Sequence, residues 1–296
     1  MFRKIIILIL VLIMATSVIG CEKEEQSVVI ASKPMTEQYI IVEMLTMLIE
    51  DRTDIVVEQK MGIGGGTQNI HPAMLDGEID IYPEYTGTGW MQVLKQDFIN
   101  DPMTLYAEVK DEYKEEFKVL WSELYGFNDT YGLALKIDLA NDLGIKTYSD
   151  LAKLGKDLRF GAEYDFFERE DGYKGLQSTY GMDFDNTVEL DIGLKYQAIG
   201  EDEVDVINIF STDGRLKEFN LLVLEDDLNY FPSYFCATLI RQETLDKYPE
   251  LESVIALLDD QISNDEMTNM NYLVEIKKQD PKKVAADFLK EKGLLD

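Results

Sequence analysis

The chain has 296 residues, of which 46% are apolar, so it can bury a substantial core and is long enough for two lobes. It carries 57 Asp and Glu against 28 Lys and Arg, a formal net charge of −29. This charge repels nucleic acid and disfavours broad contact with an anionic lipid surface, so we exclude a nucleic-acid-binding protein.

The first residues have the pattern of a lipoprotein signal peptide. Two basic residues precede an apolar stretch that is shorter than the ~20 residues of a comfortable membrane-spanning helix. The following "VIGC" resembles the bacterial lipobox, in which the cysteine is diacylated. We therefore expect a signal peptide over 1–20, a lipidated Cys21 and a polar tether over 21–26; a buried thiol is the alternative for Cys21.

Cys236 is the only other cysteine. If Cys21 is lipidated, no disulfide can form within the mature chain, and the fold depends on packing. We expect Cys236 to be a core residue.

From Val28 onward, short β-branched segments alternate with amphipathic helices, which is typical of α/β units with parallel strands. A helix follows the first strand, with Thr36 expected as its N-cap. Strands are predicted over 27–32, 54–61 and 78–82, and a second helix over 67–75. The third strand runs into "YPEYTGTGW" (82–90), at the strand end where open α/β sheets bind ligands.

A weak repeat links two parts of the chain. Asp80, Tyr85 and Thr86 in "EIDIYPEYTG" correspond to Asp205, Phe210 and Ser211 in "EVDVINIFST". Chance similarity is an alternative, because such strands are common in α/β proteins. As a true repeat, it predicts two lobes that each present one aromatic ring.

Further elements are predicted between and after these segments. A capping box from Thr147 to Asp150 opens a helix, and "RFGAEYDFF" is predicted as a strand over 159–167. The last two elements, "DEMTNMNYLVEI" and "PKKVAADFLKEKGLL", are predicted as helices.

Signals for catalysis, metal or phosphate binding are weak. "GIGGGT" (62–67) departs from both dinucleotide and P-loop patterns, and indicates a turn that brings amides near a helix N-terminus. His71 is the only histidine and is expected on a helix surface, so we predict no metal, no cofactor and no Ser-His-Asp site. Glu84 is the best candidate for a glycosidase acid, but paired acids have little specificity among 57.

Four aromatic residues fall where predicted strands meet turns: Tyr85, Tyr131, Phe210 and Tyr234. Taken singly, each is more simply a core residue whose hydroxyl, where present, finds a partner. As a group at strand ends, they are also candidates for a pocket.

Several motifs together resemble the substrate-binding lipoproteins of osmoprotectant ABC importers, which capture glycine betaine, choline, carnitine or related amines. They are "SKPMTEQYI", "DGEIDIYPEYTGTGW", "FNDTYGLAL" and "STDGRLKEFNLLVLEDDLNYFPSY", with the lipobox. The resemblance spans nearly the whole mature chain.

The resemblance implies an α/β fold of two lobes, the type II periplasmic-binding-protein architecture, with hinge crossovers and an interlobe ligand cleft. Lobe one is expected over 27–130 plus 234–296 and lobe two over 131–233. "YGLAL" and "YFCATLI" are expected to be the crossings.

By the same resemblance, Tyr85, Tyr131, Phe210 and Tyr234 form a cage for a trimethylammonium group. A quaternary nitrogen has no N–H to donate, whereas each ring face offers a cation–π attraction of about 0.5–2 kcal/mol. Phe210 departs from the tyrosine that is usual in relatives, keeping the ring and losing the hydroxyl.

The resemblance also implies that Lys33 and Arg169 meet a ligand carboxylate, that Thr88 lines the site and that Gln38 adds a polar contact. Pro34 and Met35 depart from the family pattern beside Lys33. A neutral Thr88 with two cations favours a zwitterion such as glycine betaine or carnitine over choline, which would leave both cations unpaired.

We therefore expect a solute receptor and not an enzyme. It would be lipid-anchored on the outer face of the cytoplasmic membrane, monomeric, and would deliver a quaternary amine to an ABC permease. The alternatives are a receptor for another cationic solute, such as an amino acid or polyamine held by Glu84, and, more distantly, a surface glycoside hydrolase.

Overall fold

The computed structural model describes residues 26–216 and 218–295. The predicted signal peptide and Cys21 lie outside these described residues, as does all but the last residue of the tether. Among the described residues, no helix is both long and apolar enough to cross a membrane.

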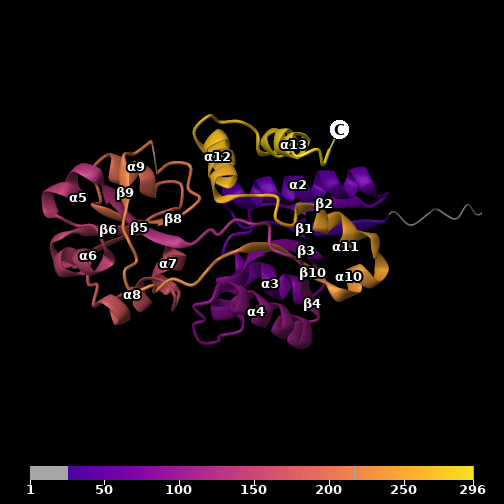
Figure 1. Cartoon of the computed structure of the whole chain (residues 1–296), viewed down its shortest axis with the longest axis horizontal. Coiled ribbons are helices and arrows are strands. Elements are labelled where there is room, and N and C mark those ends of the chain that lie inside the picture. Colours follow the sequence, from indigo (N-terminus) through magenta and orange to yellow (C-terminus); the bar gives the residue numbers. More distant parts are fainter. Residues whose placement is uncertain (1–25, 217, 296) are drawn as a thin grey trace, which may run out of the picture.

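The chain forms two lobes, each built on a five-stranded mixed sheet (Figure 1). The sheet of lobe one has the order β2-β1-β3-β10-β4, in which β10 runs antiparallel to both of its neighbours. Its strands are β1 (Ser27–Ala31), β2 (Val56–Lys60), β3 (Ile81–Tyr85), β4 (Val119–Trp121) and β10 (Cys236–Arg241). Its helices are α2 (Thr36–Arg52), α3 (Thr67–Leu75), the π-helix η1 (Thr88–Val93), α4 (Pro102–Phe117), α10 (Gln242–Lys247), α11 (Glu250–Ile255), η3 (Ala256–Leu258), α12 (Asn264–Glu275) and α13 (Pro281–Glu291).

Alternation along the strands gives lobe one a separate core on each face of its sheet. Val28 and Ile30 point to the face covered by α2, α11, α12 and α13, whereas Ala31 points to the face covered by α3 and α4 (Figure 1). Helix α2 is apolar around much of its circumference because it packs against both the sheet and α13.

Lobe two repeats this plan on a smaller scale. Its sheet has the order β7-β6-β8-β5-β9, with β5 antiparallel to β8 and β9. Its strands are β5 (Tyr131–Lys136), β6 (Arg159–Ala162), β7 (Asn186–Glu189), β8 (Val206–Phe210) and β9 (Leu221–Val223). Its helices are α5 (Ile137–Leu143), α6 (Tyr148–Leu154), η2 (Gly155–Asp157), α7 (Tyr164–Glu168), α8 (Tyr173–Tyr180) and α9 (Lys195–Gly200).

The predicted repeat is confirmed as an equivalence of the two central strands. β3 and β8 both lie between a parallel and an antiparallel neighbour, and Tyr85 and Phe210 are their last residues. Asp80 accepts the Val29 amide of the neighbouring parallel strand at 2.8 Å, and Asp205 accepts the Arg159 amide at 2.8 Å. Each aspartate thus ties the start of its central strand to the neighbouring parallel strand.

The prediction that "YGLAL" and "YFCATLI" cross between the lobes is wrong. The first forms most of β5 inside sheet two, and the second leads into β10 inside sheet one. The chain crosses in the segments before them, over 122–130 and 224–235, which contact each other through a β-bridge between Asn128 and Phe235.

Other predicted boundaries also shift. Thr36 is the first residue of α2 and not its cap, which is Met35, an extended residue with no side-chain cap bond. β3 begins at Ile81, so that "YPEY" belongs to the strand. β6 ends at Ala162, where its partner β7 also ends, and a helix follows in place of the strand predicted to 167. The capping box of Thr147 and Asp150 is confirmed.

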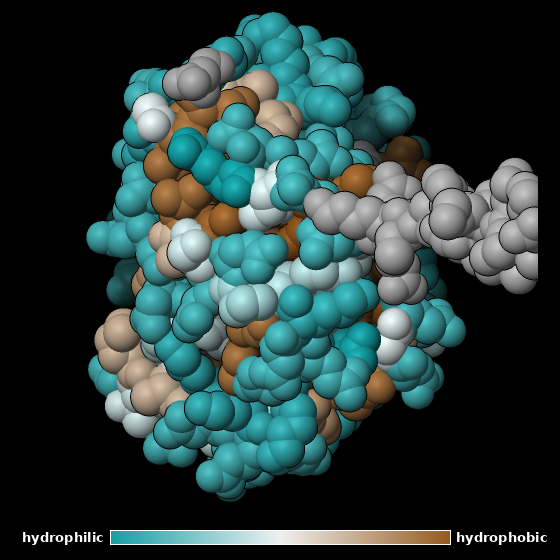
Figure 2. Space-filling model, turned by 90° about the vertical axis from the view of Figure 1, so that its right-hand side faces the viewer, coloured by the Kyte–Doolittle hydropathy of each residue, from teal (hydrophilic) through white to brown (hydrophobic). Residues whose placement is uncertain are grey.

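The outer surface agrees with the acidic composition. Figure 2 shows the end of lobe one as mostly hydrophilic, with some apolar residues between the hydrophilic ones. Apolar residues at the surface are normal for a folded protein.

Candidate functional site

A cavity of about 260 Å³ lies between the lobes. Its wall includes the ends of β3, β5 and β8, the start of η1, and the loops that follow β1, β6 and β7. Seven of the eight predicted site residues line it: Lys33, Tyr85, Thr88, Tyr131, Arg169, Phe210 and Tyr234. Segments far apart in the sequence therefore meet here, at the strand ends where open α/β sheets bind ligands.

Strand register helps to position the four predicted cage residues. Tyr131 faces Phe210 across the β5–β8 ladder, with ring centroids 5.0 Å apart. Tyr131 also meets Tyr234 edge to face at 5.5 Å. Tyr85 faces Cys236 across the β3–β10 ladder, which places it beside Tyr234. The rings therefore come from both lobes.

Hydrogen bonds to the hydroxyl groups hold two of the cage tyrosines, Tyr85 and Tyr234. The Tyr85 hydroxyl donates to Glu37 Oε1 at 2.6 Å, and the Tyr234 hydroxyl donates to Asp171 Oδ2 at 2.8 Å. Burial raises the pKa of both hydroxyls well above the ordinary value, so both remain neutral and can donate. The polar end of each side chain is thus anchored, and the ring remains available to the cavity.

Lys33 is buried and already paired. Its ammonium makes an ion pair with Glu84 and lies 4.7 Å from the centroid of the Tyr85 ring. Glu84 also accepts the Thr67 hydroxyl at 2.7 Å and the Tyr85 amide at 2.8 Å. These contacts connect the N-terminus of α3 to the last residue of β3.

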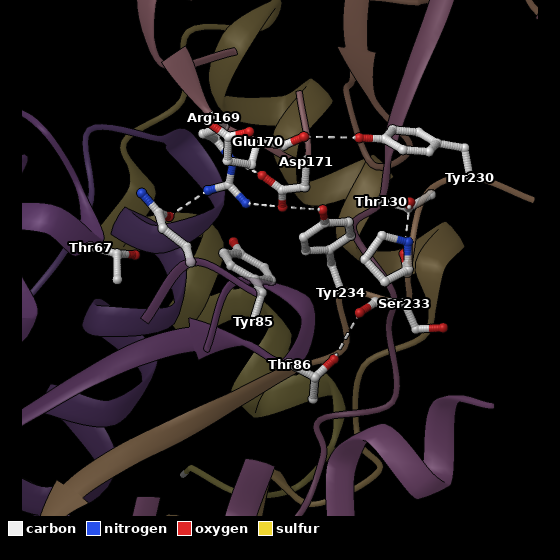
Figure 3. A network of polar contacts seen from close by, with 12 residues as sticks. Thr67, Tyr85, Thr86, Thr130, Arg169, Glu170, Asp171, Tyr230, Ser233 and Tyr234 are labelled. Atoms are coloured by element: carbon white, nitrogen blue, oxygen red, sulfur yellow. Dashed lines mark hydrogen bonds and ion pairs between the residues drawn. The ribbon is translucent and has the colours of Figure 1, made fainter. Parts of the chain in front are cut away.

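Arg169 bridges the two lobes and is also paired (Figure 3). Its guanidinium binds both carboxylate oxygens of Asp171, and its Nη1 donates to Gln92 Oε1 of lobe one at 2.6 Å. Asp171 lies between Arg169 and Tyr234 in Figure 3. The guanidinium carbon is 5.4 Å from the centroid of the Tyr131 ring, so the same group also supports the cage.

These pairs correct the argument that choline would leave Lys33 and Arg169 unpaired. Glu84 and Asp171, which the sequence argument did not include, balance both charges. The ammonium has three donors and the guanidinium five, and the contacts with the described residues do not use all of them. A ligand carboxylate can therefore bind here, but the site does not require one for charge balance.

Gln38 differs from the prediction. It is fully buried behind Tyr85, to whose hydroxyl its Nε2 donates at 3.1 Å, and it is absent from the described residues that line the cavity. The predicted direct contact between Gln38 and the ligand is therefore wrong: Gln38 instead helps to hold the Tyr85 ring in place.

Two further expectations are overturned. Glu84 is 0% exposed and outside the cavity wall, which removes the acid that both the hydrolase and the amino-acid alternatives required. His71 is buried and not on the surface, because α3 packs it against Tyr113 and Phe117, and its Nδ1 lies 3.2 Å from the Tyr82 hydroxyl.

The wall from lobe two carries acids that the sequence argument missed. Glu163, Asp165 and Asp191 line the cavity from the segments after β6 and β7. Glu163 Oε1 accepts the fully buried Lys195 ammonium at 2.5 Å. Because β6 ends at Ala162, Glu163 and Asp165 follow the carboxyl end of a parallel strand, where ligands bind; the longer predicted strand hid this position.

Comparisons with known proteins agree with this geometry. A family described as "Substrate binding domain of ABC-type glycine betaine transport system" matches residues 26–291. A crystal structure titled "glycine betaine/carnitine/choline ABC transporter" superposes with a TM-score of 0.74 at 34% identity, covering 91% of this chain and 100% of that one.

Two curated relatives are also similar. The ergothioneine transport permease/ergothioneine binding protein EgtU of Helicobacter pylori is 43% identical over 92% of this chain, which spans only 48% of that relative's length. The carnitine transport binding protein OpuCC of Listeria monocytogenes is 34% identical over 100% of this chain and 99% of its own length.

Proposed function

Since the chain belongs to the family of substrate-binding domains of ABC-type glycine betaine transport systems, we propose that it captures a betaine, a trimethylammonium zwitterion, between its lobes. The family is one of extracytoplasmic solute-binding proteins and not of enzymes. The observation that supports this ligand class is the meeting of Tyr85, Tyr131, Phe210 and Tyr234 at one cavity.

The rings suit a cation that cannot donate hydrogen bonds. Each ring face attracts such a cation by about 0.5–2 kcal/mol, so four rings together offer about 2–8 kcal/mol before association costs. The ammonium of Lys33 already lies over the Tyr85 ring, which indicates that this face accommodates a positive charge. Binding of a quaternary amine requires Lys33 to share or vacate that face.

The other end of the ligand would be a carboxylate. Lys33 and Arg169 line the same cavity as the rings. The neutral Thr88, the first residue of η1, lines it as well. Charge-assisted bonds to a carboxylate are worth about 1.5–3 kcal/mol each. Glycine betaine and carnitine are the simplest ligands with both groups.

Ergothioneine is a second candidate. It is a betaine that also carries a ring with N–H groups, and the relative named for it is 43% identical. The acids Glu163, Asp165 and Asp191 on the wall from lobe two offer acceptors for such N–H groups, which glycine betaine would leave unused.

Titration calorimetry of the purified protein tests the ligand. We expect binding of carnitine, glycine betaine or ergothioneine, weaker binding of choline, and none of glycine, which lacks the quaternary nitrogen. Tight binding of choline alone would contradict the role of Lys33 and Arg169. No heat with any quaternary amine would contradict the cage.

The remaining parts of the proposal concern place and partners. The protein would be anchored through a lipid on Cys21, act as a monomer, and deliver its ligand to an ABC permease in the membrane. Fractionation of cells expressing Cys21→Ala tests the anchor: release of the protein from membranes supports it, and unchanged membrane association contradicts it.

A further inference from the structure

Behind the cage, one hydroxyl lies between two buried carboxylates. Thr212 Oγ1 is 2.7 Å from Glu37 Oε2 and 2.8 Å from Asp129 Oδ1, and all three residues are buried. A hydroxyl has a single hydrogen to donate, so it can donate to only one of the two acceptors. The other short contact needs a second proton, carried by one of the carboxyl groups.

The surrounding groups do not supply a compensating cation. The ionisable groups around the pair include Tyr39, Tyr85, Tyr196, Asp213, Arg215, Cys236, Glu275, Lys33, Glu84 and Lys195, of which Lys195 pairs with Glu163. Asp213 adds negative charge nearby, Arg215 is 3.2 Å from Glu275, and Lys33 pairs with Glu84. Both carboxylates border a cavity of only about 100 Å³, and two unprotonated carboxylates would repel each other there with little water to screen them.

The direction of the pKa shifts agrees with this geometry. Burial raises the pKa of Glu37 to about 7 and raises the pKa of Asp129 as well. The two groups share a hydroxyl, so the proton belongs to the pair and not to one residue.

The three residues come from different parts of the molecule. Glu37 lies on α2 in lobe one, Asp129 lies in a crossing segment, and Thr212 lies two residues after β8 in lobe two. The Thr212 carbonyl also accepts the Asn271 Nδ2 of α12, in lobe one, at 3.0 Å. Separation of the lobes would break these contacts and expose both carboxylates to bulk water.

We propose that Glu37, Asp129 and Thr212 form a proton-linked latch: when the lobes close over a ligand, the two carboxylates take up a shared proton. The latch also positions the cage, because Glu37 holds the Tyr85 hydroxyl with its other oxygen. This inference rests on the proposed function, since it adds a proton to ligand-driven closure.

The sign of the effect follows from linkage. The closed state binds more protons than the open state, so lower pH favours closure and tightens ligand binding. Affinity is therefore lost as pH rises through the pKa of the closed pair, by at most about tenfold per pH unit for a single proton. A quaternary nitrogen does not titrate, so the ligand does not produce this dependence near neutral pH.

Calorimetry of carnitine and glycine betaine binding in buffers of different ionisation enthalpy counts the protons directly. For the unchanged protein we expect net proton uptake near neutral pH and a several-fold loss of affinity from about pH 6 to about pH 8. Glu37→Gln keeps the size and most hydrogen bonds of the side chain and should abolish both. Thr212→Val should reduce both. Glu50→Gln, at the exposed end of α2, should behave as the unchanged protein.

Equal proton uptake and equal pH dependence in the unchanged protein and in Glu37→Gln would overturn the latch. If no quaternary amine binds, the proposed function fails, and the latch is tested by infrared spectroscopy of the protein cross-linked between its lobes in the closed arrangement described here. A protonated-carboxyl band that is present near pH 6 and lost in Glu37→Gln supports the latch, and its absence from the unchanged protein overturns it.

Discussion

Arg169 of lobe two and Gln92 of lobe one bind each other across the cleft, with Nη1 and Oε1 2.6 Å apart. Gln92 comes from the π-helix η1, a rare conformation that is frequent at functional sites. This contact joins the lobes at the cavity wall, so it should contribute to closure even if neither atom touches the ligand.

We therefore expect Gln92→Ala to weaken ligand binding by about 1–2 kcal/mol, roughly 5- to 30-fold, through faster dissociation. Stopped-flow measurement of association and dissociation rates checks this. Gln96→Ala, four residues away in an exposed position, is the matched control and should leave both rates unchanged. An unchanged dissociation rate in Gln92→Ala would show that the contact does not hold the lobes closed.

Gly87 sits where a side chain would displace a cage ring. A Cβ atom at this position would lie 2.8 Å from Tyr234 Cε1 and 2.9 Å from the Ser233 carbonyl oxygen. Gly87→Ala should therefore move Tyr234 and weaken binding of a quaternary amine at least about tenfold, together with a stability loss of about 1–3 kcal/mol. Calorimetry and urea denaturation measure the two effects.

Gly64→Ala provides the comparison, because its Cβ would meet no atom within 4 Å. It should bind and unfold as the unchanged protein does. If Gly87→Ala were as benign as Gly64→Ala, Tyr234 would not be held as closely as described.

Tyr131 contacts Phe210, Tyr234 and Phe166, and it faces the cavity. Tyr131→Leu keeps an apolar side chain but removes the ring face, so we expect a loss of about 1–2 kcal/mol in the binding of every quaternary amine. Tyr272→Leu, on α12, removes a ring outside the cavity wall and should leave affinity unchanged. Equal affinities for the two variants would remove Tyr131 from the cage.

Glu37 should also make stability depend on pH. Its pKa is raised from 4.5 to about 7 in the folded protein, so the folded state binds its proton more tightly than the unfolded chain does. The stability contributed by this proton is fully present below the unfolded value and is lost as pH rises toward 7. Urea denaturation between about pH 5 and about pH 8 should show a decline that is smaller in Glu37→Gln by about 1–3 kcal/mol.

Glu50→Gln again serves as the control, since it removes one exposed carboxylate and changes the net charge equally. The Glu37→Gln protein should be more stable than the unchanged protein at the upper end of this pH range. A parallel decline in all three proteins would assign the effect to overall charge repulsion instead.

The family motifs identified all four rings, and for Tyr85 and Phe210 a local repeat of strand sequence pointed the same way. The Asp80–Tyr85 and Asp205–Phe210 segments each place an aspartate at the start and a ring at the end of a central strand, and that spacing is visible without a structure. The alternation of strands and helices predicted α/β units, while the chain length and the family resemblance predicted two lobes.

What the sequence could not supply was the partner of each charge. Lys33 pairs with Glu84 only because β1 and β3 are neighbours in the sheet, and Arg169 reaches Gln92 only across the lobes. Glu163 and Asp165 were missed because "RFGAEYDFF" reads as one strand, although the ladder with β7 ends at Ala162. Charge pairing and strand length depend on neighbours that are distant in sequence.

The crossing segments have a mechanical consequence. Tyr131 begins the strand that one crossing enters, and Tyr234 lies next to the start of the strand that the other enters. If one lobe rotates against the other about these segments, two rings of the cage lie near the axis and move little, while the far ends of the lobes move most. A ligand bound by these rings would then lie near the rotation axis, and a permease touching the far ends of the lobes would detect occupancy as a large displacement.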